Sequence, residues 1–156
     1  IDREKSIASM HVCRGNWSKD ESILLTGPYT PLLDLFADIN ADLLALEFST
    51  PRAGELKSLL ADERIKNKII LGLGVLNPRF DQKEDVDVIY NRAKEALTYI
   101  DKENLWLNPD CGFATFSNRP VNEYENIRAK VGSMIEARDR LRADYEWWYK
   151  LFFQIL

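Results

Sequence analysis

The order of hydrophobic and polar positions divides the chain into short apolar runs separated by longer segments with helical spacing. The apolar runs occupy residues 6–12, 42–48, 68–76 and 104–110. Each run is bounded by polar or turn residues, and its length suits a β-strand. The runs are continuous rather than alternating, which is typical of strands that are buried on both faces in a parallel sheet.

Between and after these runs, apolar residues recur every three or four positions, which predicts amphipathic helices. We expect helices over residues 30–39, 52–60, 84–100 and 122–141, and Pro31 suits the first turn of the first of them. Because predicted strands and helices alternate, the sequence indicates an α/β fold with four βα units.

The length of the chain limits how these units can be arranged. The 156 residues are enough for one domain with a hydrophobic core, and no internal linker is evident, so residues 1–156 are expected to form a single domain. Four parallel strands fit an open doubly wound sheet or half of a (β/α)8 barrel, which needs about 250 residues. The aromatic-rich tail at residues 145–156 is either a terminal helix packed on the body or a surface for self-association.

Composition and charge exclude several classes of partner. The chain is 46% hydrophobic and 29% charged, with a net charge of -4, and its basic residues are scattered, so we expect no nucleic-acid binding. No apolar run approaches the roughly 20 residues of a membrane helix, so no membrane association is expected. The polar start IDREKS is unlike a signal peptide, which favours a cytoplasmic protein, and a start at Ile1 suggests a processed or truncated chain.

Four side chains that can bind a metal lie at equivalent places in the predicted units. His11 and Cys13 close the first strand, Glu47 closes the second, and Cys111 follows the fourth. The carboxyl ends of parallel strands are where catalytic residues gather, and residues two apart on a strand face the same side. Imidazole, thiolate and carboxylate are the usual ligands of zinc, which can hold an incoming thiol as a thiolate.

Each of these residues also has a structural interpretation. A lone histidine is often packed or simply exposed, and a free cysteine often fills space in a core. Cys13 and Cys111 could form a disulfide, although secreted disulfide scaffolds are usually smaller and richer in cysteine. Glu47 could pair with Arg52. The shared position at strand ends is what favours the zinc site over these alternatives.

The sequence motifs around these residues are similar to those of a known family. The motifs are HVC at 11–13, LALEFSTPR at 44–52, LGLGV at 71–75 and LWLNPDCGF at 105–113. They resemble, in order and approximate spacing up to about Leu141, the C-terminal catalytic barrel of cobalamin-independent methionine synthase. NPDCG is the most specific element, and CRGNW at 13–17 is closest to the short single-barrel relatives.

The resemblance implies a (β/α)8 TIM barrel of which this chain covers about the C-terminal half. It implies a zinc ion held by His11, Cys13, Glu47 and Cys111, and methyl transfer to the sulfur of homocysteine from a methylated folate or another donor. The partners would then be a small-molecule thiol and a methyl donor. Because earlier strands of the barrel are absent, we expect self-association or pairing with an N-terminal barrel half.

One residue departs from the family pattern, and another has two interpretations. Aligning GLGV places Arg79 where the long form of the family has a histidine that acts as an acid. Arginine stays protonated in proteins, so Arg79 is a poor proton donor. Its planar guanidinium group, however, is suited to binding an anionic group. Asp110 could orient a metal ligand, or form the turn after Pro109. Our expected catalytic residues are Glu47, Arg79 and Asp110.

Three functions remain open at this point. The first is zinc-dependent methyl transfer to homocysteine, which yields methionine. The second keeps the zinc but transfers an alkyl group to another thiol, such as coenzyme M opening an epoxide. The third is a truncated barrel half that has no activity of its own.

Overall fold

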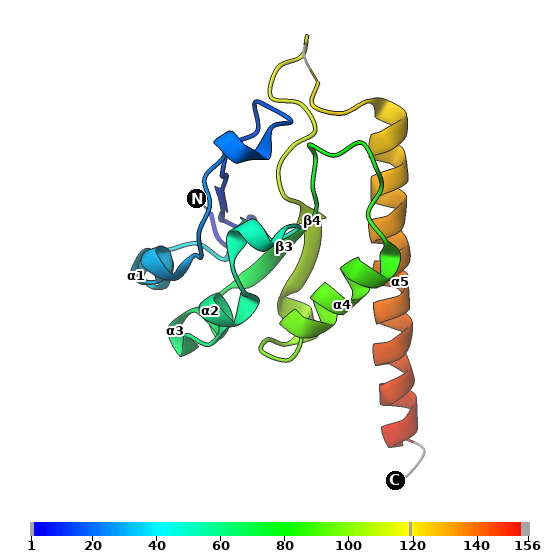
Figure 1. Ribbon diagram of the computed structural model, residues 1–156. Coiled ribbons are helices and arrows are strands. Elements are labelled where there is room, and N and C mark those ends of the chain that lie inside the picture. Colours follow the sequence, from blue (N-terminus) through cyan, green and yellow to red (C-terminus); the bar gives the residue numbers. More distant parts are fainter. Residues whose placement is uncertain (1, 119, 154–156) are drawn as a thin grey trace.

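The computed structural model describes residues 2–118 and 120–153, with no description of the side chains of residues 146–153. Four parallel strands form one sheet in the order β1-β2-β3-β4, which is also their order in the sequence (Figure 1). The strands are β1 (Ser9–Val12), β2 (Leu43–Glu47), β3 (Ile70–Leu76) and β4 (Leu105–Pro109). Each strand lies within one predicted run, which confirms the α/β fold with a parallel sheet.

The helices follow the predicted order with two differences. The α-helices are α1 (Leu33–Asp38), α2 (Leu56–Leu60), α3 (Glu63–Lys66), α4 (Val86–Ala96) and α5 (Tyr124–Phe153). Short 3-10 turns are η1 (Glu21–Ile23), η2 (Thr30–Leu32), η3 (Pro51–Ala53) and η4 (Lys102–Asn104). The helix expected over 52–60 is divided, because Gly54 adopts a φ of 79° that ends η3 before α2 begins. Helix α3 has no counterpart in the predicted pattern.

The two faces of the sheet differ in what covers them. One face carries buried aliphatic side chains that pack against the helices, among them Leu44, Leu46, Leu71 and Leu73. On β1, by contrast, burial alternates, and His11 is exposed. Burial on both faces was therefore a wrong prediction for β1, and it is also wrong for β4 at the exposed Trp106. The reason at β1 is that no described helix covers the second face of the sheet along this strand.

The sheet is open at both edges within the described residues. β1 pairs only with β2, and β4 pairs only with β3. The parallel register aligns His11 with Ala45, and Glu47 with Gly74, so the carboxyl ends of the strands lie along one edge. That edge is where the side chains expected to bind a metal meet.

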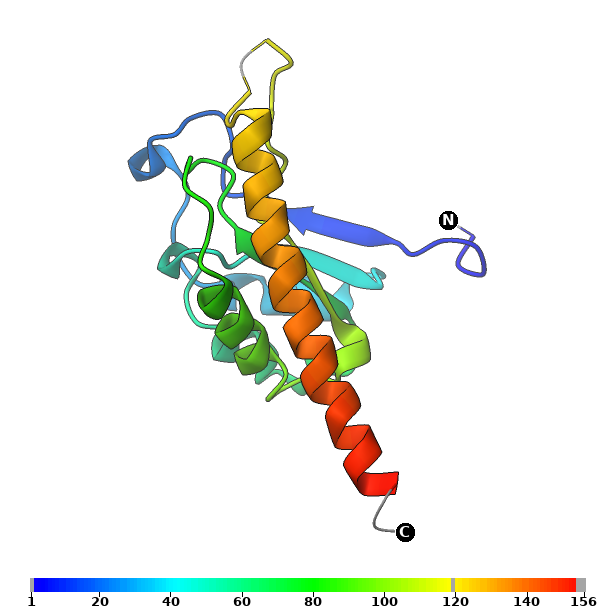
Figure 2. The same ribbon diagram turned by 90° about the vertical axis from the view of Figure 1, so that its right-hand side faces the viewer.

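Helix α5 lies alongside α4 and extends past the sheet toward the C-terminus (Figure 2). It continues to Phe153, so the first part of the aromatic-rich tail at 145–156 is helical, which is compatible with both interpretations of the tail. What the tail's side chains beyond Tyr145 contact lies outside the described residues. Within the described residues, no helix combines the length and the apolar character needed to cross a bilayer.

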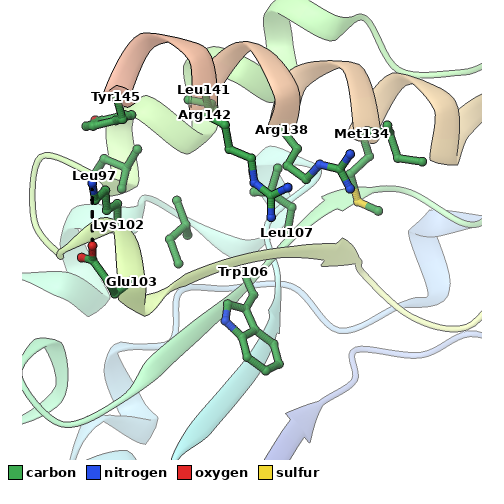
Figure 3. Close-up of a pocket in the computed structure, with 12 residues that line it drawn as sticks. Leu97, Lys102, Glu103, Trp106, Leu107, Met134, Arg138, Leu141, Arg142 and Tyr145 are labelled. Carbon is green, nitrogen blue, oxygen red and sulfur yellow. Dashed lines mark ion pairs between the residues drawn. The ribbon is translucent and has the colours of Figure 1, made fainter. Parts of the chain in front are cut away.

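A groove of about 800 Å³ separates the middle of α5 from the beginning of β4. Leu105 and Leu107 line it from the strand, and Arg138 and Arg142 reach over it from the helix (Figure 3). Trp106 points to the opposite side of β4, as alternation along a strand requires. The groove is formed by the start of β4, whereas Cys111 follows the other end of that strand.

Candidate metal centre

The four side chains expected to bind a metal converge in the structure. One ligand atom from each of His11, Cys13, Glu47 and Cys111 can be chosen so that all four lie within 4.8 Å of one another. His11 and Cys13 come from β1 and the residue after it, Glu47 ends β2, and Cys111 follows β4. The sheet order therefore brings together residues that are up to 100 positions apart in the sequence.

The hydrogen bond that His11 makes to the sheet orients its ring. Nδ1 lies 2.8 Å from the carbonyl oxygen of Ala45 on the neighbouring strand. Because a carbonyl only accepts, the neutral form of the ring has its proton on Nδ1 and its lone pair on Nε2. Nε2 lies 3.3 Å from Cys111 Sγ, so the free lone pair is directed into the cluster. A hydrogen bond from the other ring nitrogen to a backbone carbonyl, as made here to Ala45, is usual for a histidine that binds a metal.

The two cysteines are free thiols rather than a disulfide. Their sulfur atoms lie 3.2 Å apart, well beyond the roughly 2.05 Å of an S–S bond. The Gly15 N–H donates to Cys13 Sγ at 3.3 Å, and Asn16 Nδ2 donates to the Gly112 carbonyl at 2.6 Å. The loops that carry the two sulfur atoms are therefore tied to each other.

Electrostatics in the cluster disfavour an uncompensated set of anions. Burial raises the pKa of the Cys111 thiol far above its ordinary value, and hydrogen bonds to Cys13 and Glu47 raise it further. Two thiols and a carboxylate at this distance would repel one another if all were ionised. A bound cation reverses this balance, because its charge stabilises thiolates directly.

Glu47 uses its two oxygen atoms differently. Oε1 faces the cluster, 3.1 Å from Cys111 Sγ, and accepts a hydrogen bond from the Arg14 backbone N–H at 2.9 Å. Oε2 faces away and binds Arg52 Nη2 at 2.9 Å. The alternative interpretation of Glu47 as a partner of Arg52 is therefore compatible with its place in the cluster.

Tyr29 fixes the backbone at the end of β2. Its hydroxyl accepts from the Glu47 N–H at 3.0 Å and donates to the Glu47 carbonyl at 3.3 Å. Burial raises the pKa of Tyr29, so the hydroxyl stays protonated and can donate. The Arg14 guanidinium stacks 4.3 Å from the centre of the ring. The role of Tyr29 was not predicted from the sequence, since a single aromatic residue in a loop carries no pattern.

Asp110 joins the ends of β4 and β2. Oδ1 accepts from the backbone N–H groups of Phe48 and Ser49 at 3.1 and 3.0 Å, and Oδ2 accepts from the Ser49 hydroxyl. Burial raises the pKa of Asp110 to about 6, an effect that the Ser49 hydrogen bond opposes and that Glu47 strengthens. The Asp110 carboxylate thus orients the loop after Glu47 by binding the backbone N–H groups of that loop.

Arg79 lies beneath the cluster with its side chain fully buried. Nη2 is 3.7 Å from Glu47 Oε2 and 3.9 Å from Asp110 Oδ2, while Nη1 donates to the Gly15 carbonyl at 3.1 Å. The expected anionic partners are therefore carboxylates of the protein itself. With its fork enclosed in this way, Arg79 does not present a site for the anionic group of a substrate.

The four side chains fit a tetrahedral zinc ion. With bonds of about 2.0–2.1 Å to nitrogen and about 2.3 Å to sulfur, ligand atoms around zinc lie roughly 3.3–3.8 Å apart. Cys111 Sγ lies 3.1–3.3 Å from the other three ligand atoms, close to that spacing. His11 and Cys13 are exposed, whereas Glu47 and Cys111 are buried, so the cluster is open on one side.

Comparison with known families agrees with this geometry. Residues 7–140 match the family described as "Cobalamin-independent synthase, Catalytic domain". The chain belongs to this family of methionine synthases. The match covers all four strands and all four side chains of the cluster, and it confirms the resemblance drawn from the sequence motifs.

Individual family members are longer than this chain. The protein YxjG of Bacillus subtilis (strain 168) is 30% identical over 82% of this chain, which spans 33% of YxjG. The 5-methyltetrahydropteroyltriglutamate--homocysteine methyltransferase of Xylella fastidiosa (strain M23) is 30% identical over 74% of this chain, which spans 14% of that enzyme.

The fold also resembles a solved structure. A B12-independent methionine synthase from Shewanella sp. W3-18-1, in complex with selenomethionine, superposes with a TM-score of 0.71 at 18% identity. The superposition covers 90% of this chain and 40% of the other. The structure described here thus has the fold of part of a methionine synthase, with its sheet open.

Proposed function

We propose that this chain binds zinc through His11, Cys13, Glu47 and Cys111, and that the site serves methyl transfer to the thiol of homocysteine. The observation that carries the proposal is the convergence of these four side chains within 4.8 Å. Membership of the family supports the reaction, because relatives matched by most of the chain are named as homocysteine methyltransferases. Nothing among the described residues favours coenzyme M as the acceptor.

The residues of the cluster and its surroundings would have different roles in this reaction. Bound zinc supplies the positive charge that keeps an incoming thiol deprotonated at neutral pH. His11 and Cys13 border the exposed side of the cluster, from which a substrate would approach. Glu47 contributes Oε1 from the buried side, while Asp110 holds the loop that follows Glu47. Arg79 and Asp110 act on the ligands rather than on the substrate.

We also propose that strands of an N-terminal barrel half pair with the open edges of β1 and β4. Neither edge pairs with another strand in the part of the chain that the structure describes, and proteins generally cover such edges. The chain spans about a third of YxjG, so full-length relatives have enough further residues to supply such a half. The methyl donor and the rest of the homocysteine site would then bind largely to residues of that half.

Metal content tests the site directly. Purified protein should contain about one zinc per chain by plasma mass spectrometry, as a four-ligand site implies. Cys111→Ser should lose most of the metal, because it removes the thiolate nearest to all three other ligands. Glu55→Gln, which changes an exposed carboxylate before α2, should keep it. Unchanged zinc in Cys111→Ser would refute the assignment.

Turnover tests the reaction. The zinc-loaded chain, combined with an N-terminal barrel half, should convert homocysteine to methionine when supplied with 5-methyltetrahydropteroyltriglutamate, the donor in the relatives' name. Cys111→Ser in the same mixture should reduce the rate by about a hundredfold or more, since the thiol would no longer be activated. Zinc-loaded protein that methylates no homocysteine in this complex would refute the reaction while leaving the metal site intact.

A further inference from the structure

A network of charges lies on the side of Glu47 that faces away from the cluster. Two buried guanidinium groups approach Glu47 Oε2, with Arg52 Nη2 at 2.9 Å and Arg79 Nη2 at 3.7 Å. Glu47 is only 1% exposed, and a carboxylate buried this deeply requires charged partners. Two guanidinium groups that approach the same carboxylate oxygen atom repel each other, unless a further anion lies close to both of them.

Glu21 provides that anion from η1, in the loop after β1. Its Oε1 lies 3.1 Å from Arg79 Nε and 3.3 Å from Arg52 Nη1, and it accepts a hydrogen bond from Asn77 Nδ2 at 2.6 Å. One oxygen atom of Glu21 is thus shared among donors from the loops that follow β2 and β3. The loops after three neighbouring strands are thereby joined behind the ligands.

We infer that Glu21 is a positioning residue for the metal centre, acting through Arg52 and Arg79 on the orientation of Glu47. Glu21 draws the two guanidinium groups back, so that Arg52 holds only Oε2 and leaves Oε1 directed toward Cys111. Two guanidinium nitrogen atoms near these carboxylates, Arg79 Nη2 and Arg52 Nη1, are buried without a hydrogen-bond partner. Their N–H groups can bind Glu47 when Glu21 no longer holds the two guanidinium groups through Arg79 Nε and Arg52 Nη1.

The direction of the effect follows from the charges. Without the charge of Glu21, both guanidinium groups would be balanced mainly by Glu47, which would then turn toward them and away from the cluster. The added net positive charge near the site would also oppose binding of a cation. Partners behind metal ligands typically contribute 10–100-fold to metal affinity, and we expect Glu21 to fall in this range.

The inference rests on the proposed zinc site, so the experiment first measures that site in the unaltered chain. Zinc affinity is determined by competition with a chromophoric chelator, and Co²⁺ is used as a spectroscopic substitute. Glu21→Gln should weaken zinc binding about 10–100-fold. Its Co²⁺ complex should retain the thiolate-to-metal charge-transfer bands of Cys13 and Cys111, while the d–d bands that report coordination geometry shift.

Two further variants separate positioning from a general effect on the loop. Asp20→Asn alters the neighbouring carboxylate, which binds Ser22 rather than the arginines, and should change neither affinity nor spectrum. Glu21→Asp restores the charge and should recover part of the lost affinity. If Glu21→Gln does not fold, as judged by circular dichroism, Arg79→Lys is measured in its place. Lysine lacks the guanidinium group that binds Glu21 and the Gly15 carbonyl at the same time, so the same loss of zinc affinity is expected.

The possible outcomes distinguish the two proposals. Unaltered protein that fails to bind zinc or Co²⁺ would refute the proposed function itself. Unaltered protein that binds zinc, together with Glu21→Gln of equal affinity and an unchanged Co²⁺ spectrum, would overturn only the role of Glu21. Equal losses in Asp20→Asn and Glu21→Gln would also overturn it, since they would indicate disruption of the loop.

Discussion

At the scale of single residues, Gly74 explains how Asp110 reaches the end of β2. Gly74 lies on β3, between the two strands that Asp110 connects. A Cβ at this position would lie 2.6 Å from the Leu46 carbonyl oxygen and would also overlap with Asp110 Oδ1. The absence of a side chain therefore creates the space in which the buried carboxylate binds Phe48 and Ser49.

Gly74→Ala should destabilise the protein by about 1–3 kcal/mol, because backbone and a buried carboxylate would have to move. Urea denaturation, followed by circular dichroism, measures the change. Gly132→Ala is the matched control, since a Cβ there meets nothing within 4 Å and lies on α5, where alanine gains up to about 1 kcal/mol. Equal midpoints for the two variants would contradict this account of Gly74.

At the scale of elements, Asp42 links the segment before β1 to the start of β2. Its carboxylate accepts a hydrogen bond from the Ala8 N–H at 2.7 Å and forms an ion pair with Arg3. The Ala8 hydrogen bond, with a smaller contribution from Arg3, lowers the pKa of Asp42 below its ordinary value. Among the described residues β1 pairs only with β2, so this contact helps to hold β1, and with it His11, in register.

The lowered pKa gives the Asp42 contact a pH dependence of known sign. A carboxylate whose pKa falls on folding stabilises the native state above its unfolded pKa of about 3.9 and loses that effect as pH falls through its folded pKa. Asp42→Asn should therefore lower the urea midpoint at pH 7, and its difference from the unaltered protein should shrink below about pH 4. Asp38→Asn, at an exposed carboxylate of α1, should show no such dependence. A difference that grows as the solution is acidified would contradict the assignment.

At the scale of the whole molecule, the described chain is an open sheet with one face packed against helices. Trp106 lies on edge strand β4, is 47% exposed, and points away from α5 (Figure 3). A large aromatic side chain on an unpaired edge is typical of a surface that another element covers. In the proposed pairing, the N-terminal barrel half would cover the exposed Trp106.

Trp106→Lys should weaken association with such a half, expressed separately from a full-length relative such as YxjG, by at least about tenfold. Light scattering after gel filtration would report a one-to-one complex, and titration calorimetry would give its affinity. Tyr124→Lys, at an exposed aromatic position that begins α5, should leave the affinity unchanged. A homodimer in place of this complex would favour pairing of two copies instead.

The sequence by itself determined the features that depend on near neighbours along the chain. Continuous apolar runs placed all four strands, and helical spacing placed all the longer helices, because periodicity reflects local geometry. The positions of His11, Cys13, Glu47 and Cys111 at strand ends followed from those elements. The family motifs include the same four residues, so the cluster of these side chains was predictable before any contact was known.

The sequence suggested the pair of Glu47 and Arg52, but only the tertiary structure showed that Glu21 and Arg79 join this pair. Glu21 and Arg79 come from loops after two other strands, and nothing in their local sequence indicates that they meet. Their pairing depends on the order and register of the sheet, and both are set by packing between distant segments. The open edges of β1 and β4 follow for the same reason, since closing a sheet requires strands that local patterns within these residues do not supply.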